Sequence, residues 1–295
     1  MPLLSRFKEQ EERDLEWFTE HASDAHRMQW GINQVLYRGK SAYQTVEIFE
    51  SAEWGRCLVL DGVMQTTMGD EYIYHEMLGL VPLTAHPNPQ DVLIIGGGDG
   101  GLVREVLKVA TVRRVTLVEI DELVVSVSRQ FLPGISCALD DDRVEIVYGD
   151  GATFLESALS QYDAILVDST DPEGTGPGTV LYTEAFHASV RSALKPQGVF
   201  AQQTGTPFYN PEVVSMVSAD LARQFPLAHV FWTTIPTYPG GLFTFAAASL
   251  GPNLASPLWI PTFKTRWYTP DLHRHAFILP ELIKPLVDPK VLVAE

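Results

Sequence analysis

Cysteine is nearly absent from the 295-residue chain, which carries only Cys57 and Cys137, in unrelated contexts and without C-x-x-C spacing. So low a count excludes a disulfide framework, and the spacing gives no reason to expect a structural zinc site. Long apolar runs are absent as well. The first residues, MPLLSRFKEQEERDLEWF, lack a signal-peptide core, and no stretch reaches membrane-spanning length. We therefore expect a soluble, cytoplasmic protein with no membrane partner.

Basic residues are scarce too, with 21 Lys and Arg against 37 Asp and Glu, which gives a net charge of -16. This balance argues against nucleic acid as a partner, because phosphate binding requires a basic surface. An acidic surface attracts small cations such as polyamines or metal ions, but it also simply confers solubility. Charge alone therefore does not choose the ligand.

The N-terminal part of the chain has a strand-like pattern. Residues 33–68 alternate apolar and polar positions, most clearly in 43–51 and 56–67, which predicts short antiparallel strands. A helical pattern follows over 69–85, and the Pro- and Asn-rich stretch HPNPQ (86–90) breaks it. We predict a small N-terminal β domain, residues 1–85, that ends in a helix, followed by a larger domain, residues 86–295.

The larger part alternates strand and helix patterns. Near-continuous apolar strands separated by amphipathic helices indicate a parallel sheet covered on both faces. Only IPTYPGG separates the last two strands, too little for a helix, so we expect that pair to be antiparallel. The fold class is therefore α/β, a doubly wound, mostly parallel Rossmann-like sheet of the methyltransferase type that carries the small antiparallel β domain. The predicted strands span 91–95, 114–120, 143–150, 162–168, 198–203, 229–234 and 242–248.

The stretch VLIIGGGDGGLVREVLK, residues 92–108, is typical of a buried strand, a glycine turn and a helix. Gly96, Gly98 and Gly101 fit the G-x-G-x-x-G fingerprint of dinucleotide sites. Asp99 lies inside the turn, where a pyrophosphate would require backbone N–H groups and no negative charge. The loop therefore favours a ligand with a cationic group over a dinucleotide.

Carboxylates follow each of the first four predicted strands of the larger domain. Asp99 follows the first, Glu119 ends the second, Asp150 ends the third, and Asp168 and Asp171 follow the fourth. Each has an ordinary explanation, because Glu119 suits any ribose site, Asp150 suits a helix cap and Asp171 suits a turn. Because ligands bind at this edge of an open α/β sheet, the set predicts a cleft that needs a neutralising cation.

We expect that cation to be part of the ligand. No His/Cys cluster accompanies the carboxylates, and nothing resembles a calcium loop or a set of phosphate-binding lysines, so no metal is predicted. Glu119 can accept hydrogen bonds from ribose hydroxyls and Asp150 from an adenine amine. A sulfonium nucleoside, which is cationic and lacks phosphate, suits these groups.

The ordered series GGGDGG, REVLK, VEID, GDG, DSTDP and IPTYPGG resembles the polyamine aminopropyltransferases, the family of the spermidine synthases. LDGVMQTTMGDEYIYHEML, residues 60–78, is close to the family's signature segment. The resemblance covers about residues 30 to 280. It implies transfer of the aminopropyl group of decarboxylated S-adenosylmethionine, a co-substrate and not a tightly bound cofactor, to putrescine, which gives spermidine and 5′-methylthioadenosine.

The resemblance also implies roles for individual residues. Asp168 is the candidate general base, and Asp99 would pair with the aminopropyl ammonium and reject the carboxylate of ordinary S-adenosylmethionine. The acceptor diamine would contact Gln65, Tyr74, His75, Asp99, Asp168, Asp171, Gln203 and Tyr238. The donor would contact Gln44, Gly96, Gly98, Asp99, Glu119, Asp150, Gly151 and Pro177. A loop over 172–180 would gate the site, and the N-terminal domain would form part of its wall and pair subunits into a homodimer or homotetramer.

Alternatives remain open at this stage. Without the motif, His75 would be a packing residue of its helix, Tyr238 a turn residue and Gln65 a strand residue. Cadaverine, agmatine or spermidine could replace putrescine as the acceptor. A methyltransferase shares the glycine loop and the acid after the second strand, although Asp99 and DSTDP argue against it, and a non-catalytic polyamine-binding protein could use the same scaffold.

Overall fold

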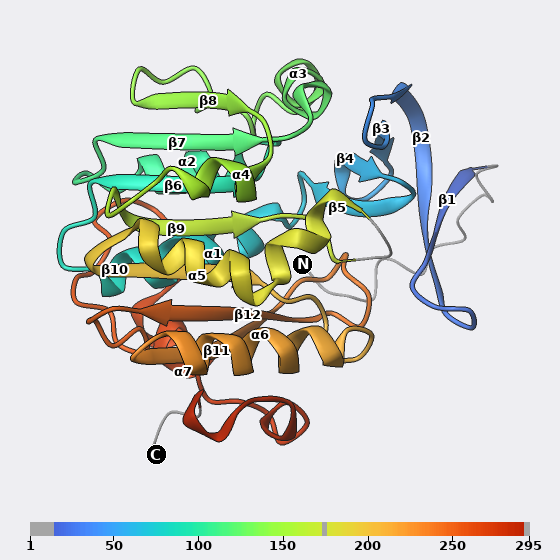
Figure 1. Cartoon of the computed structure of the whole chain (residues 1–295). Helices are drawn as coiled ribbons and strands as arrows, with labels where there is room; N and C mark the ends of the chain where they lie inside the picture. Colours follow the sequence, from blue (N-terminus) through green and yellow to red (C-terminus); the bar gives the residue numbers. More distant parts are fainter. Residues whose placement is uncertain (1–14, 173–175, 292–295) are drawn as a thin grey trace.

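The computed structural model describes residues 15–172 and 176–291 of the chain. These residues form two sheets, and the carboxyl ends of the parallel strands of the larger sheet face the smaller one (Figure 1). The arrangement confirms the predicted α/β fold with an N-terminal antiparallel sheet. No helix among the described residues combines the length and apolar character needed to cross a membrane.

The N-terminal sheet is antiparallel throughout, with the strands in chain order. It consists of β1 (Glu16–His21), β2 (Arg27–Lys40), β3 (Thr45–Ser51), β4 (Gly55–Leu60) and β5 (Val63–Thr67). β2 is longer than the short strands expected and is irregular in its pairing with β3. β1 was not predicted from the sequence because its pattern is inverted, with Trp17 exposed and Glu20 buried.

The larger sheet has the strand order β11-β12-β10-β9-β6-β7-β8. In the described part of the sheet β12 is antiparallel to both of its neighbours, β10 and β11, as expected for β11 and β12 from the short connection between them, and the other strand pairs are parallel. The strands are β6 (Asp91–Gly96), β7 (Arg114–Glu119), β8 (Val144–Tyr148), β9 (Tyr162–Asp168), β10 (Leu194–Gln203), β11 (Leu227–Thr234) and β12 (Leu242–Ser249).

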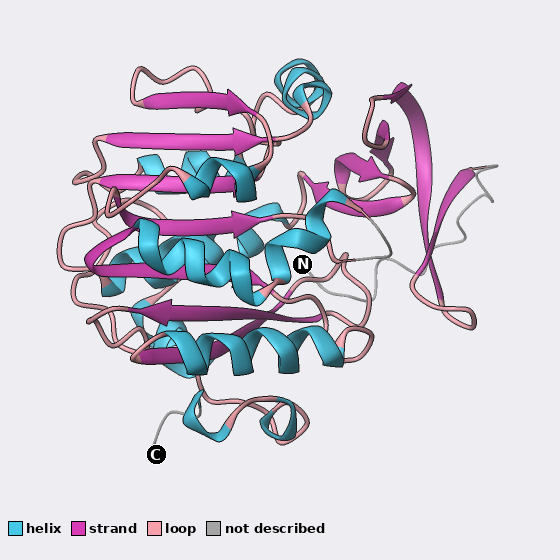
Figure 2. Ribbon diagram, in the orientation of Figure 1, coloured by secondary structure: helices cyan, strands magenta, loops and turns pink. Residues whose placement is uncertain are grey.

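Helices cover both faces of the larger sheet (Figure 2). Along β6, Val92 and Ile94 face one apolar core, while Leu93 and Ile95 face the other. Because both faces of β6 pack against an apolar core, the strand has no polar face. The helices are α1 (Glu71–Ala85), α2 (Gly101–Leu107), α3 (Glu122–Phe131), α4 (Gly151–Glu156), α5 (Glu184–Ala193), α6 (Pro211–Gln224), α7 (Pro270–Ala276) and the short turns η2 (Pro177–Tyr182), η3 (Lys284–Leu286) and η4 (Pro289–Val291).

Helix α1 packs against the larger sheet. Met77 and Leu80 are fully buried in the core that also contains Val92, Ile94 and Phe245. The predicted domain boundary after residue 85 stays a prediction, but the packing joins α1 physically to the larger sheet. Because α1 directly follows β5, it brings residues from the end of the small sheet to the carboxyl edge of the large one.

Candidate active site

A cavity of about 440 Å³ lies at the carboxyl edge of the larger sheet and extends to the N-terminal sheet. Every site residue predicted from the sequence lines this cavity except Pro177. Pro177 opens η2, but its side chain lies outside the described part of the chain, as do residues 173–175 of the predicted gating loop. The fold thus gathers in one cavity residues that the sequence spreads from Gln44 to Tyr238.

The glycine loop that follows β6 contacts the carboxyl ends of the two neighbouring strands, β9 and β7. Gly96 has a φ of +76°, and an added Cβ there would lie 2.1 Å from the carbonyl oxygen of Asp168. An added Cβ at Gly98 would lie 2.9 Å from a carboxylate oxygen of Glu119. Glycine is required at these positions because the loop must run against β7 and β9 without side chains. The close approach places Asp99 beside Asp168.

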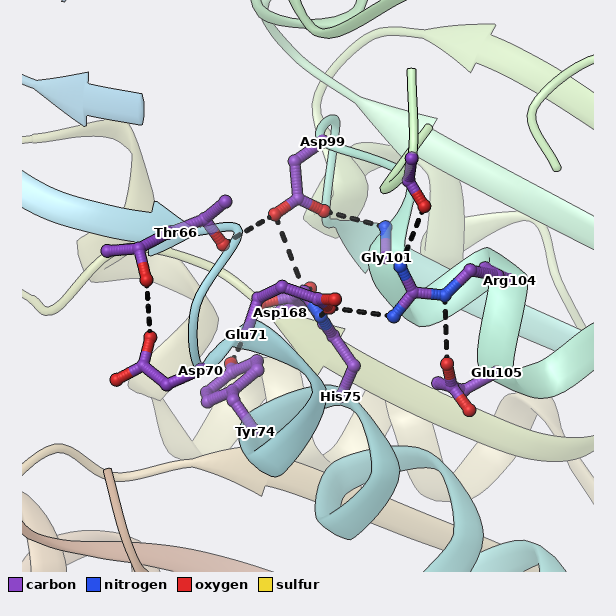
Figure 3. Close-up of polar contacts among 12 residues, drawn as sticks. Thr66, Asp70, Glu71, Tyr74, His75, Asp99, Gly101, Arg104, Glu105 and Asp168 are labelled. Atoms are coloured by element: carbon purple, nitrogen blue, oxygen red, sulfur yellow. Dashed lines mark hydrogen bonds and ion pairs between the residues drawn. The ribbon is translucent and has the colours of Figure 1, made fainter. Parts of the chain in front are cut away.

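Both carboxylate oxygens of Asp99 accept hydrogen bonds from the protein. Oδ1 accepts from the backbone N–H of Gly101 at 2.8 Å, and Oδ2 accepts from the Thr66 hydroxyl at 2.8 Å (Figure 3). Asp99 is buried. Hydrogen bonds from two elements, the start of α2 and β5, therefore fix the orientation of the Asp99 carboxylate.

Asp168 ends β9, and its Oδ1 accepts a hydrogen bond from the Tyr74 hydroxyl at 2.8 Å. Burial raises its pKa from 3.8 to about 6, with the charge of His75 opposing and the charge of Asp99 adding to the rise. This is the direction expected from a cluster of carboxylates. A carboxyl group with this pKa can both accept and return a proton near neutral pH.

His75 lies between these two carboxylates, 3.6 Å from Asp99 and 4.0 Å from Asp168, measured from its Nε2 to the nearer Oδ2 of each. A single histidine therefore lies with these acids, because α1 crosses the strand ends and carries His75 to them. Nδ1 of His75 bonds to Glu71 at 2.7 Å, so the two ring nitrogens face carboxylates on opposite sides.

One end of the cavity is formed by Glu119 and its neighbours. Glu119 accepts hydrogen bonds from the backbone N–H groups of Gly98 at 3.1 Å and Asp121 at 2.9 Å. Burial raises its pKa to about 7 despite these donors. Gln44 reaches the same region and donates to Asp121 at 3.0 Å. This end offers acceptor oxygens at the position that suits ribose hydroxyls.

Asp150 lies two residues beyond the end of β8, whereas the predicted strand ended with it. β8 ends at Tyr148, and the Asp150 side chain caps α4 by accepting from the Thr153 N–H at 2.9 Å. Its cap role is therefore real, and the residue also lines the cavity. An added Cβ at Gly151 would lie 2.3 Å from the Ile95 side chain, which keeps the start of α4 close to β6.

At the other end, polar groups surround the space beyond Asp168. Gln203 donates to Asp171 at 2.9 Å and to the Tyr182 hydroxyl at 2.7 Å. Tyr238 donates to the backbone carbonyl of Gln65 at 2.5 Å, which links the loop after β11 to β5. The arrangement joins both sheets around this end of the cavity.

The comparisons with known proteins decide the family. Residues 71–255 match the model of the spermine/spermidine synthase domain, and residues 16–68 match that of the spermidine synthase tetramerisation domain. The chain belongs to the spermine/spermidine synthase family. Its enzyme class is aminopropyltransferase, which agrees with the charge of the cavity.

Curated relatives and solved structures resemble this family member over nearly their whole length. The polyamine aminopropyltransferase of Bacillus mycoides (strain KBAB4) is 42% identical over 276 residues, 92% of this chain and 98% of the relative. That of Moorella thermoacetica is 43% identical over 277 residues, 92% and 96% of the two chains. A spermidine synthase solved with the transition state analogue AdoDATO has a TM-score of 0.91 and 36% identity, covering 96% of this chain and 99% of its own. The spermidine synthase of Thermotoga maritima has a TM-score of 0.88 and 34% identity, covering 97% and 99%.

Several residues of this aminopropyltransferase site were not found from the sequence. Thr66 orients Asp99, and Glu71 with Arg104 supports His75 from behind (Figure 3). His21 and Glu20, at the end of β1, also line the cavity. The i, i+4 spacing of Glu71 and His75 was the one available signal for this support.

Proposed function

We propose that this aminopropyltransferase is a spermidine synthase that transfers the aminopropyl group of decarboxylated S-adenosylmethionine to putrescine. The observation that carries the proposal is the pair of Asp99, which is buried, and Asp168, which is partly buried, in one cavity that Glu119 also lines. Ribose and adenine would lie toward Glu119 and Asp150, and the amines toward Asp99, Asp171 and Gln203. The AdoDATO complex of the related spermidine synthase supports this choice of donor.

The reaction we propose is an in-line displacement at the methylene carbon next to the sulfonium. A putrescine ammonium first gives a proton to Asp168, and the neutral nitrogen then forms the new C–N bond while the C–S bond breaks. Its electron pair stays on sulfur, so 5′-methylthioadenosine leaves as a neutral thioether. The pKa of about 6 suits Asp168 to this role, because amines of this kind have pKa values near 10.4 and arrive protonated.

Donor selection would depend on Asp99. A positive aminopropyl ammonium pairs with its carboxylate, whereas the carboxylate of ordinary S-adenosylmethionine would meet a negative charge in a buried site. The match of residues 16–68 to the spermidine synthase tetramerisation domain supports assembly of the chain into a homotetramer.

Product analysis tests the proposal. The full chain is incubated with decarboxylated S-adenosylmethionine and, separately, with putrescine, cadaverine, agmatine or spermidine, and 5′-methylthioadenosine and the amine product are quantified. We expect putrescine to give the highest kcat/KM and Asp168→Asn to reduce it by at least about a hundredfold. A higher kcat/KM with another amine would replace putrescine as the acceptor. Tight diamine binding without 5′-methylthioadenosine from any amine would favour a polyamine-binding protein.

A further inference from the structure

His75 is held from one side by a carboxylate that plays no part in the reaction proposed above. Its Nδ1 lies 2.7 Å from Oε2 of Glu71, one helical turn earlier on α1, and both side chains are buried. The opposite ring nitrogen, Nε2, faces Asp99 and Asp168. The imidazole is therefore placed between one carboxylate behind it and two in front of it (Figure 3).

Arg104 fixes the carboxylate behind the ring. Its Nη2 donates to the same Oε2 of Glu71 at 2.7 Å, its Nε donates to Glu105 at 2.9 Å, and its Nη1 donates to the carbonyl of Gly134 at 3.1 Å. Lys108 in turn bonds to Glu105 at 2.6 Å. A guanidinium held at three of its nitrogens cannot rotate freely, so α2 sets the position of a side chain on α1.

Hydrogen-bond direction then decides the protonation of the ring. A carboxylate can only accept, so Nδ1 must donate to Glu71. A neutral ring would consequently present the Nε2 lone pair to Asp99 and Asp168, two groups that repel it. A proton on Nε2 turns both contacts into attractions. Burial alone would lower the pKa of His75, but the charges of Asp99, Glu71 and Asp168 raise it to about 9.

We propose that Glu71 and Arg104 are positioning residues that hold His75 as an imidazolium, which serves as a built-in counter-cation for Asp99 and Asp168. The charges alternate from Arg104 through Glu71 and His75 to the two reactive-site carboxylates. This cation keeps Asp168 ionised at neutral pH, so that it can accept the proton of the acceptor amine. In this last step alone the inference rests on the proposed function.

The groups around the ring come from four elements. Glu71 lies on α1 with His75, Asp99 lies in the loop before α2, Asp168 ends β9, and Arg104 lies on α2 behind Glu71. The neighbouring Tyr74 hydroxyl donates to Asp168 and does not touch the ring nitrogens. A pH dependence of this cluster therefore reports these charges together.

The first arm of the test measures the charge of His75 without any turnover. Ligand-free full chain labelled at histidine is titrated by NMR, and the His75 signal is assigned by its loss in His75→Gln. We expect His75 to titrate near pH 9 and Glu71→Gln, which keeps an acceptor for Nδ1 but removes its charge, to lower that midpoint by about one unit or more. The matched control Glu105→Gln removes the other carboxylate of Arg104 and should leave the midpoint within about 0.3 units.

A wild-type His75 midpoint below pH 7, or equal midpoints in Glu71→Gln and wild type, would overturn the proposal. If Glu105→Gln shifts the midpoint as far as Glu71→Gln does, the shift does not depend on the contact between Glu71 and His75. That result would also overturn the positioning role. Because this arm needs no substrate, a wrong acceptor or a wrong general base would leave its result unchanged.

The second arm measures the effect of the cation on Asp168. The acid limb of kcat/KM for the diamine is recorded for wild type and His75→Gln, with thermal denaturation to confirm folding. Loss of the counter-cation should move the acid limb to higher pH by about one unit. A uniformly lower kcat with an unmoved acid limb would mean that His75 only contacts substrate, which contradicts the counter-cation role.

Discussion

The hydroxyl of Tyr74 is predicted to set the pH at which the enzyme gains activity. It donates to Oδ1 of Asp168 at 2.8 Å, and burial together with the charge of Asp168 raises the pKa of Tyr74 well above 10, so it remains a donor. Tyr74→Phe removes only this group. The remaining ring keeps its packing against Phe243 and Phe245, whose centroids lie 5.8 and 5.4 Å away.

The size of the effect follows from the kind of hydrogen bond that is lost. A hydrogen bond to a charged group contributes about 1.5 to 3 kcal/mol, and one pKa unit corresponds to about 1.4 kcal/mol. Losing a donor to the ionised form should raise the pKa of Asp168 from about 6 to about 7 or 8. At pH 7 the ionised fraction of the base would then fall from about 90% to between about 50% and 10%.

The assay is kcat/KM for the acceptor amine from about pH 5 to pH 9 at saturating donor, with release of 5′-methylthioadenosine as the signal. The acid limb of Tyr74→Phe should lie one to two units above that of wild type, and activity should recover at high pH. Tyr268→Phe is the matched control, because it removes a buried hydroxyl that contacts Thr84 and His273, outside the cavity. An acid limb that stays in place or moves to lower pH would refute the assignment of Asp168 as the group that titrates.

Three further changes test other parts of the site. Asp99→Asn should reduce the ratio of affinities for the decarboxylated donor over S-adenosylmethionine by about tenfold or more, measured by calorimetry, because the charge that separates the two ligands is gone. Glu119→Gln should raise the free energy of unfolding at pH 8 by about 1 to 3 kcal/mol and leave it unchanged near pH 4, measured by urea denaturation. The sign follows because the fold raises the pKa of Glu119 from 4.5 to about 7, so the ionised group destabilises the fold increasingly as pH rises through that window. Gly101→Ala should lower kcat by at least about tenfold, since its Cβ would lie 2.2 Å from the His75 ring, whereas Gly134→Ala, with its nearest contact at 3.8 Å, should behave as wild type.

Much of the fold was predictable because the larger domain repeats one local pattern. Each parallel strand is apolar on both faces, so Val92 and Leu93 carry the same signal although they face different cores. β1 was not predictable in this way. Its buried position belongs to Glu20, which lines the cavity, while its large apolar residue, Trp17, is exposed. A strand whose polar side chain faces a binding cavity inverts the alternation on which the prediction depends.

The carboxylates of the site were predictable because strand ends of a parallel sheet share one edge. The residues that contact these carboxylates or support His75 were not predictable, because their positions depend on how the helices pack against one another. Arg104 and Glu71 are 33 residues apart and meet only where α2 packs beside α1. For the same reason the helical pattern alone did not place His75 between Asp99 and Asp168, and only the resemblance to the family assigned it to the site.

The two central carboxylates differ in how the protein occupies their oxygens, and this difference supports separate roles. Both oxygens of Asp99 accept from fixed donors, Thr66 and the backbone of Gly101, so its position is set before a ligand arrives. Among residues 15–172 and 176–291, Asp168 accepts a single hydrogen bond, from Tyr74, and its second oxygen faces the His75 ring. Burial raises the pKa of Asp168 toward neutrality, which is the property that the proposed general base requires. A carboxylate with two fixed donors, such as Asp99, instead suits pairing with the ammonium of a ligand. The number of donors to each carboxylate therefore agrees with the proposed roles, donor selection for Asp99 and proton transfer for Asp168.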